Sequence, residues 1–200
     1  MEQIVVGMAD CKVAAGAGQI LATFALGSCI ALSVYDPRAC IGGLLHYMLP
    51  DSSIDPARGT ENPFMFADTG IPRLFEQVCA RGATRRQLVA HVAGGASIMD
   101  PGNVFDIGRR NHLALRRILW KAGVLIGGEA VGGTNSRTVR LEVGTGRLWL
   151  QEGCGQRELV QGFPRLAPAA APADIPAHTN GSAPWTKKGA GNGLPGLNRR

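Results

Sequence analysis

The strongest constraint on the fold of this 200-residue chain is a stretch of 23 residues, 13–35, that contains no charged side chain. Its length alone would allow it to cross a bilayer as a helix, for which about 20 apolar residues suffice. However, glycine, serine, threonine and glutamine residues interrupt it and lower both its hydropathy and its helix propensity. Buried β-strands accommodate such a sequence better. The segment therefore predicts strands in a core and no insertion into a membrane.

The rest of the chain adds short strands and two amphipathic helices. Apolar or alternating patterns predict strands at 2–8, 20–25, 30–35, 41–49, 88–93, 124–131, 138–143 and around 148–150. Helices are expected between Thr69 and Gly82 and at 111–122, because apolar side chains recur there at helical spacing and glycine follows each. Two or three helices against a largely antiparallel sheet make a mixed α/β (α+β) sandwich, which we expect to end near residue 162.

The final 38 residues, 163–200, differ in composition from the rest. They hold six of the twelve prolines and five basic residues against one acidic residue, so they carry +4 of the formal net charge of +6. Such a segment buries too little apolar surface to offset the entropy lost on ordering. We therefore expect a domain at 1–162 and a disordered basic tail at 163–200. Because the charge lies mostly in this tail, it gives no evidence for nucleic-acid binding.

Cysteine and glycine spacing excludes several kinds of site. The five cysteines form no C-x-x-C pair, so neither a zinc-ligand pattern nor a thioredoxin-type motif is found. The glycine clusters lack a complete G-x-G-x-x-G fingerprint and the end of a phosphate loop, and there is no G-x-S-x-G motif. We therefore expect neither a metal nor a cofactor. Unpaired cysteines and an N-terminal segment without the basic start of a signal peptide predict a cytoplasmic location.

One cysteine and one histidine are predicted to lie together. The segment from Asp36 to Ala39 is a typical turn sequence between the strands expected at 30–35 and 41–49. A turn centred on its middle makes the numbers of paired residues sum to 75, which places Cys29 opposite His46 with Cβ atoms about 5 Å apart. The alternative is a buried structural cysteine and a core histidine whose ring is satisfied.

Such a pair would suit a cysteine nucleophile. A free thiol has a pKa of about 8.5, and a neighbouring imidazolium would lower that pKa and later protonate the leaving group. Thr23, on the preceding predicted strand, has a hydroxyl that can orient the imidazole. The backbone N–H groups of Gly27 and Ser28 are candidates for an oxyanion hole. The expected catalytic set is therefore Cys29, His46 and Thr23, with Gly27 and Ser28 as backbone donors.

Several short motifs occur in the order found in one known family. They are Leu26-Gly-Ser-Cys29, Tyr35-Asp-Pro37, Gly42-Gly43 followed by His46-Tyr-Met-Leu-Pro50, Gly94-Gly-Ala96, Ile107-Gly-Arg-Arg-Asn111, and Gly132-Gly133 followed by Arg137. Over roughly residues 5–160 the chain resembles the chemoreceptor glutamine deamidases, the CheD family of bacterial chemotaxis. The resemblance places the family's nucleophile on Cys29, its histidine on His46 and its third catalytic residue on Thr23.

The resemblance implies a protein-glutamine deamidase, an amidohydrolase that converts selected glutamine side chains of methyl-accepting chemoreceptors to glutamate through a Cys29 thioester. Some members are described as acting on glutamyl methyl esters as well. The resemblance also implies a fold similar to the deamidase domain of the cytotoxic necrotizing factors, and in some bacteria a CheC-type phosphatase as partner. Neither nucleic acid nor a membrane is expected to bind.

Two other functions stay open from the sequence. One is a non-catalytic binding module that docks chemoreceptors or a CheC-type phosphatase and keeps the cysteine site as a contact surface. The other is a thiol redox sensor in which Cys29 and Cys40, on the two arms of the predicted hairpin, form a disulfide. Cys29→Ala would leave the binding of the module intact, and peroxide would oxidise the sensor to an intramolecular disulfide.

Overall fold

The computed structural model describes residues 1–98, 106–160 and 162. The strands are β1 (Glu2–Val5), β2 (Asp10–Ala15), β3 (Gln19–Leu26), β4 (Ile30–Asp36), β5 (Ile41–Tyr47), β6 (Val89–Gly94), β7 (Leu125–Val131), β8 (Arg137–Glu142), β9 (Arg147–Glu152) and β10 (Gly155–Val160). The helices are α1 (Pro56–Glu61), α2 (Ala67–Ala80) and α3 (Ile107–Ala122), with 3-10 turns η1 (Ser52–Ile54), η2 (Pro63–Met65) and η3 (Arg85–Gln87). The basic tail expected at 163–200 lies outside the described residues.

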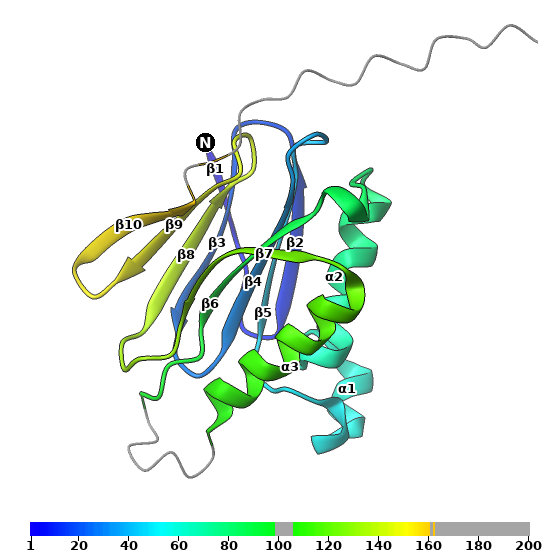
Figure 1. Ribbon diagram of the computed structural model, residues 1–200, viewed down its shortest axis with the longest axis vertical. Helices are drawn as coiled ribbons and strands as arrows, with labels where there is room; N and C mark the ends of the chain where they lie inside the picture. The colour runs from blue at the N-terminus through cyan, green and yellow to red at the C-terminus, as the bar shows by residue number, and fades with distance from the viewer. Residues whose placement is uncertain (99–105, 161, 163–200) are drawn as a thin grey trace, which may run out of the picture. The chain divides into compact units, whose positions relative to one another are not determined.

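The described strands form two five-stranded sheets, which pack face to face (Figure 1). One has the order β1-β3-β8-β9-β10 and the other β2-β5-β4-β6-β7. Within the described chain, β1–β3 and β6–β7 pair in parallel and the other neighbours are antiparallel. The mixed α+β class is thus confirmed. The single sheet that the sequence favoured is wrong, because the expected strands divide between two sheets and two further strands, β2 and β10, join them.

Strands β4 and β5 are buried along their whole length. They lie inside the second sheet, with α2 and α3 on one face and the first sheet on the other. A strand covered on both faces needs apolar side chains on both sides. The uncharged segment 13–35 contributes all of β3 and all of β4 except Asp36, and its side chains line the two apolar cores on either side of β4. No helix among the described residues is long and apolar enough to cross a membrane.

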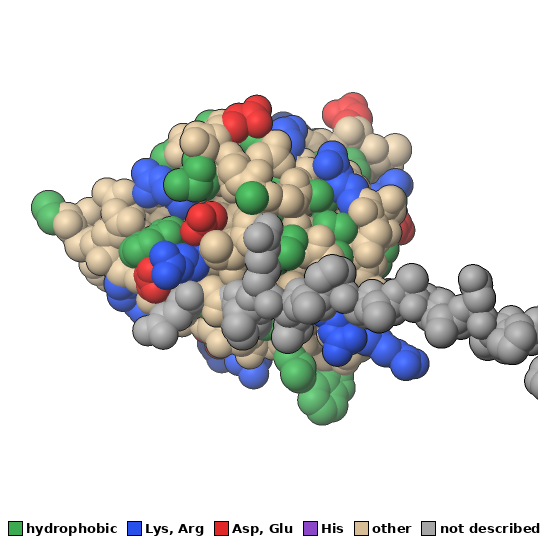
Figure 2. All heavy atoms as spheres, turned by 90° about the horizontal axis from the view of Figure 1, so that it is seen from above, with side chains coloured by type: hydrophobic (Ala, Val, Ile, Leu, Met, Phe, Trp, Pro, Cys, Tyr) green, Lys and Arg blue, Asp and Glu red, His purple; other side chains and the backbone are tan. Residues whose placement is uncertain are grey.

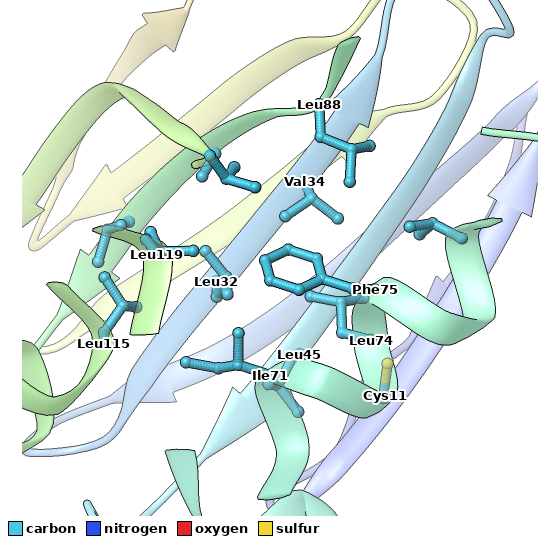
Figure 3. Packing of buried hydrophobic residues seen from close by; sticks show 14 of the residues in the cluster. Cys11, Leu32, Val34, Leu45, Ile71, Leu74, Phe75, Leu88, Leu115 and Leu119 are labelled. Carbon is cyan, nitrogen blue, oxygen red and sulfur yellow. The ribbon is translucent and has the colours of Figure 1, made fainter. Parts of the chain in front are cut away.

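The two faces of the β4–β5 hairpin belong to two separate apolar cores. Figure 3 shows the first core, in which side chains of β4 and β5 meet those of α2 and α3: Leu32, Val34, Leu45, Ile71, Leu74, Phe75, Leu115 and Leu119. The second core, between the sheets, includes Leu21, Leu26, Ala31, Leu44, Ala93, Val139, Leu141, Leu148 and Leu150. Because successive side chains of a strand alternate between its faces, Leu45 and Tyr47 point to the helices and Leu44 and His46 to the first sheet.

Two adjacent glycines allow both neighbouring layers to approach the backbone of β5. A Cβ atom on Gly43 would lie 2.6 Å from Leu74 Cδ1 and 2.8 Å from Val78 Cγ1, both on α2. A Cβ atom on Gly42 would lie 2.8 Å from Leu141 Cδ2 of β8, on the opposite side. Carbon atoms in contact lie about 3.5–4.0 Å apart, so neither layer could pack this closely against a larger residue.

Both long helices begin earlier than the apolar spacing predicted. Thr69, the expected cap of α2, instead donates its hydroxyl to Pro63 O at 2.6 Å, and the helix begins at Ala67. Helix α3 begins at Ile107, directly after Asp106, which has a left-handed backbone with φ of 44°. The early start of α3 places Asn111 inside the helix, next to the site described below.

Replacing Gly43 by valine should lower the free energy of unfolding by about 1–3 kcal/mol, because the added carbons overlap α2. Leu74→Ala alone should cost about 2–5 kcal/mol. The double variant should lose less than the sum of the two, because the shortened Leu74 side chain makes room for the valine. Urea unfolding followed by circular dichroism measures all three variants. Simple additivity would contradict direct packing of Gly43 against Leu74.

Candidate active site

Thr23 and His46 come from different sheets and meet between them. Thr23 lies on β3 and His46 on β5, and Thr23 Oγ1 is 2.8 Å from His46 Nδ1, within hydrogen-bond distance. The two residues are 0% and 2% exposed. A hydrogen bond between buried groups is expensive to break, because neither group would find water in its place. The structure thus brings together two of the three residues of the expected catalytic set.

The β4–β5 hairpin has a different register from the one predicted. His46 pairs with Ala31, so the numbers of paired residues sum to 77 and not 75. The connection is longer than expected and comprises residues 37–40. Asp36 Oδ1 stabilises this connection by accepting hydrogen bonds from two backbone N–H groups. Cys40, the last residue of the connection, has a left-handed backbone with φ of 52°. The prediction that Cys29 lies directly opposite His46 is therefore wrong.

Cys29 nevertheless lies on the same face of the hairpin as His46. It directly precedes β4, and alternation along the strand places it on the side of Ala31, towards the first sheet. Its partly buried side chain packs against the core between the sheets. Diagonal neighbours across a strand pair have Cα atoms about 7–8 Å apart, which a side-chain rotation can bridge. Cys29 thus lies on the His46 side of the hairpin, towards the sheet that carries Thr23.

Burial sets the protonation state of the cysteine and the histidine. It lowers the pKa of His46 from 6.5 to about 4, an effect partly opposed by Asp10, its cross-strand neighbour on β2. Burial also raises the pKa of the Cys29 thiol above its ordinary value, while a backbone hydrogen bond acts in the other direction. At neutral pH the resting pair is therefore a neutral thiol and a neutral imidazole.

The unpaired ring nitrogen of His46 is the atom suited to take the thiol proton. Nε2 is buried and has no hydrogen-bond partner among the described residues. If Nδ1 carries the proton and donates it to Thr23 Oγ1, then Nε2 has a free lone pair and is a base. The Thr23 hydroxyl can accept from Nδ1 or donate to it, and Nε2 is a base in the tautomer in which Nδ1 donates.

The loop before β4 is held by its carbonyl groups. The oxygens of Gly27, Ser28 and Cys29 accept hydrogen bonds of 2.8, 3.0 and 2.8 Å from Ala96 N, Asn111 Nδ2 and Gly95 N, respectively. In a trans peptide the C=O group and the following N–H group point in opposite directions. These bonds therefore turn the N–H groups of Ser28 and Cys29 away from the protein groups that hold the loop.

Asn111 of α3 ties this loop to the strand that carries His46. Its side-chain amide donates to Ser28 O and also, at 2.8 Å, to Met48 O. Its backbone carbonyl oxygen accepts a hydrogen bond of 2.9 Å from the Tyr47 hydroxyl. It is completely buried. In the sequence, Asn111 stands out only as the end of the Ile107–Asn111 motif, with no predicted role. The signal that could have found it is a polar residue on the apolar face of a helix, since a buried polar group needs partners.

Two backbone features fix the shape of the loop. Ala25 has φ of 53° next to an irregularity in the pairing of β3, and a left-handed alanine costs about 1–3 kcal/mol. On the other side, a Cβ atom on Gly94 would overlap the carbonyl oxygen of Cys29. Only glycine at position 94 therefore lets the end of β6 lie against the loop that carries Cys29.

A pocket of about 530 Å³ opens beside Cys29. It is lined by the loop before β4, the segment after β6 and the start of α3: Ala25, Gly27, Ser28, Cys29, Ala96, Ser97, Ile98, Asp106, Ile107 and Gly108. Most of these residues are small or apolar. Pockets of about 300–1,000 Å³ with few polar groups are typical of ligand sites, so this one can take a side chain together with its neighbours.

Cys29 and Cys40 lie too far apart to form a disulfide. Cys29 precedes β4 and Cys40 precedes β5, so the seven residues of β4 and the turn separate them. A seven-residue strand spans about 23 Å. The Cα atoms of a disulfide lie about 4–7 Å apart. The redox-sensor hypothesis built on this pair is therefore wrong.

The other candidate ligands and histidines lie apart from Cys29. Among the described residues no group of three or more His, Cys, Asp or Glu side chains is placed to hold a metal ion. His91 is buried on β6, and His112 lies on α3, with Nε2 3.1 Å from Glu129 Oε1.

Comparisons with known proteins point to one family. A family model described as CheD chemotactic sensory transduction matches residues 48–152. The "Probable chemoreceptor glutamine deamidase CheD" of Solibacter usitatus (strain Ellin6076) is 74% identical over 165 residues, which are 82% of this chain and 98% of that protein. Similarly named proteins of Syntrophus aciditrophicus (strain SB) and Anaeromyxobacter dehalogenans (strain 2CP-C) are 49% and 48% identical over 80% and 76% of this chain, and over 100% and 96% of their own lengths.

Acid should destabilise the protein, because burial lowers the pKa of both His46 and His91 from 6.5 to about 4. In the unfolded chain both histidines become protonated as the pH falls below 6.5. In the folded protein they stay neutral down to about pH 4. The stabilisation is complete above pH 6.5 and is lost as the pH falls through this interval, by up to about 3 kcal/mol per histidine. Urea unfolding at a series of pH values measures the loss. In His91→Gln the pH dependence should fall to about half, and an unchanged dependence would contradict the assignment.

Proposed function

Because the chain belongs to the CheD family, we propose that it is a chemoreceptor glutamine deamidase, which hydrolyses specific glutamine side-chain amides of methyl-accepting chemoreceptors to glutamate. The observation that carries the proposal is the buried Thr23–His46 hydrogen bond on the face where Cys29 lies. This arrangement supplies a thiol, a base for its proton and a group that orients the base. The names of the relatives support the same activity.

In the proposed first step, the sulfur of Cys29 attacks the amide carbon while His46 Nε2 takes the thiol proton. The resting neutral pair fits general-base catalysis, in which the proton moves as the substrate is attacked. The C–N bond of the tetrahedral intermediate then breaks, and His46 returns the proton to the departing ammonia. The product of this half-reaction is a thioester between Cys29 and the former glutamine.

In the second step, water replaces ammonia. His46 Nε2 takes a proton from the water, whose oxygen attacks the thioester carbon. The C–S bond breaks, the proton returns to Cys29, and glutamate is released. The net reaction consumes one water and releases one ammonia, with no change in oxidation state.

The backbone N–H groups of Ser28 and Cys29 are the proposed oxyanion donors. The carbonyl oxygens of Gly27 and Ser28 are tied to Ala96 and Asn111, so the following N–H groups point the other way. Of the two donors expected from the sequence, Gly27 and Ser28, we therefore retain Ser28 and propose Cys29 in place of Gly27. Each such donor contributes about 10²–10³ in rate when it meets the developing negative charge.

The setting of the enzyme belongs to the same proposal. We assign the deamidase domain to residues 1–162, place the protein in the cytoplasm and expect its fold to resemble the deamidase domain of the cytotoxic necrotizing factors. A CheC-type phosphatase is proposed as a partner. The non-catalytic alternative, a module that binds receptors without turnover, differs from the enzyme in one property, because its function would survive loss of the Cys29 sulfur.

Cys29→Ala should abolish deamidation of a chemoreceptor cytoplasmic fragment, because no thioester can form. Mass spectrometry of the fragment's peptides detects conversion of glutamine to glutamate. Cys154→Ala is the matched control, since Cys154 is exposed and lies on the β9–β10 turn, and it should keep full activity. Wild-type activity in Cys29→Ala would overturn the proposed mechanism, and receptor binding without any turnover by the wild type would support the binding module.

Thr23→Val should lower kcat by at least about 10²-fold, because valine keeps the shape of threonine but cannot hold the tautomer of His46. Thr23→Ser retains the hydroxyl and should restore most of the rate. The rate of alkylation of Cys29 by iodoacetamide, followed against pH, separates this effect from misfolding. An equal loss in the serine and valine variants would show that Thr23 acts through packing alone.

A further inference from the structure

The solvent face of α3 carries positive charge and exposed apolar residues but no acidic side chain. Its exposed residues are Arg109, Arg110, Leu113, Arg116, Arg117, Trp120 and Lys121, and we refer to this set as the α3 face. Trp120 is 86% exposed and Leu113 42% exposed. Exposed tryptophan is unusual on a surface without a partner, and it is the residue type most enriched at binding hot spots.

The spacing of these residues suits contact with another helix. Leu113 and Trp120 are seven positions apart, as are Arg110 and Arg117, so each pair lies on one line along α3. Apolar residues at this spacing are what one helix presents to a second helix packed along it. The basic residues flank the apolar line, where charged groups of a partner helix would lie.

A hollow deepens the α3 face at its C-terminal end. It has a volume of about 540 Å³ and is lined by Trp120, Lys121 and residues at the start of β7, including Leu125, which is 77% exposed. At the lower edge of the molecule in Figure 2, hydrophobic side chains protrude beside Lys and Arg side chains. The hollow offers room for an apolar side chain from a partner.

Most of the positive charge on the α3 face lacks an internal counter-charge. Arg109 lies 3.4 Å from Asp106, and Arg116 lies 3.3 Å from Glu129. Arg110, Arg117 and Lys121 form no ion pair with any described residue. Two copies of this face would repel each other, whereas an acidic partner would be attracted to it.

The α3 face begins at the pocket beside Cys29. Ile107 and Gly108, the first residues of α3, line that pocket. A helix of 16 residues is about 24 Å long. An elongated partner lying along α3 therefore reaches the pocket with one end while it covers Trp120 with the other.

We propose that the α3 face docks an acidic amphipathic α-helix of the protein substrate and so aligns its glutamine with Cys29. This inference rests on the proposed deamidase function.

Binding is tested first, with turnover removed by Cys29→Ala. A chemoreceptor cytoplasmic fragment with unmodified glutamines is titrated with this variant by fluorescence anisotropy at low and high salt. Adding Trp120→Ala, Arg117→Glu and Lys121→Glu should weaken binding at least about 10-fold and reduce its dependence on salt. The matched control, Arg38→Glu with Arg157→Glu, changes the same charge at exposed sites on the β4–β5 turn and on β10 and should bind as before.

Activity distinguishes failure of this inference from failure of the proposed function. With Cys29 intact, the Trp120→Ala, Arg117→Glu, Lys121→Glu variant should raise KM for the receptor fragment at least about 10-fold but leave the deamidation of a short capped glutamine peptide unchanged. Unchanged receptor binding and KM in this variant would overturn the docking proposal while leaving the deamidase intact. The docking proposal would also be overturned if Cys29→Ala failed to bind the fragment. It would be overturned as well if the three substitutions on the α3 face abolished self-association of the protein and left receptor binding unchanged. Absence of any deamidation by the wild type would instead contradict the proposed function.

Discussion

The rest of the structure depends on the burial of the β4–β5 hairpin from both sides. Because sheet and helices both press on this hairpin, its side chains must alternate between two cores, and its backbone needs glycine at positions 42 and 43. The same burial removes water from His46 and so lowers its pKa. A catalytic base on an open sheet would keep its ordinary pKa and would lack the fixed contact with Thr23. Fold and chemistry therefore share one physical cause.

Asn111 connects α3 to the loop that carries Cys29. Its amide holds Ser28 and Met48 together, one residue before Cys29 and two residues after His46. Gly94 holds the other side of the loop at a distance that no larger residue permits. The loop is therefore positioned by contacts from α3 and from the end of β6 and the residues that follow it.

Local patterns in the sequence were sufficient for the elements that are strongly apolar or regularly spaced. The strands that became β4 and β5 and the helices α2 and α3 all follow from periodicity. The hairpin register does not follow from periodicity. It depends on the four-residue connection 37–40, in which Asp36 accepts hydrogen bonds from two backbone N–H groups, and the sequence is also compatible with a shorter turn. Strands β2 and β10 were missed because Asp10, Lys12, Arg157 and Glu158 interrupt their apolar pattern. The division into two sheets rests on long-range pairing, which no local pattern encodes.

The origin of Thr23 and His46 on different sheets has a consequence for how activity is acquired. A chain that has formed only one sheet, or both sheets without closing the core between them, has all the local structure of the site but no site. During refolding, the recovery of activity must therefore follow the closure of the interlayer core and not the earlier appearance of β-structure.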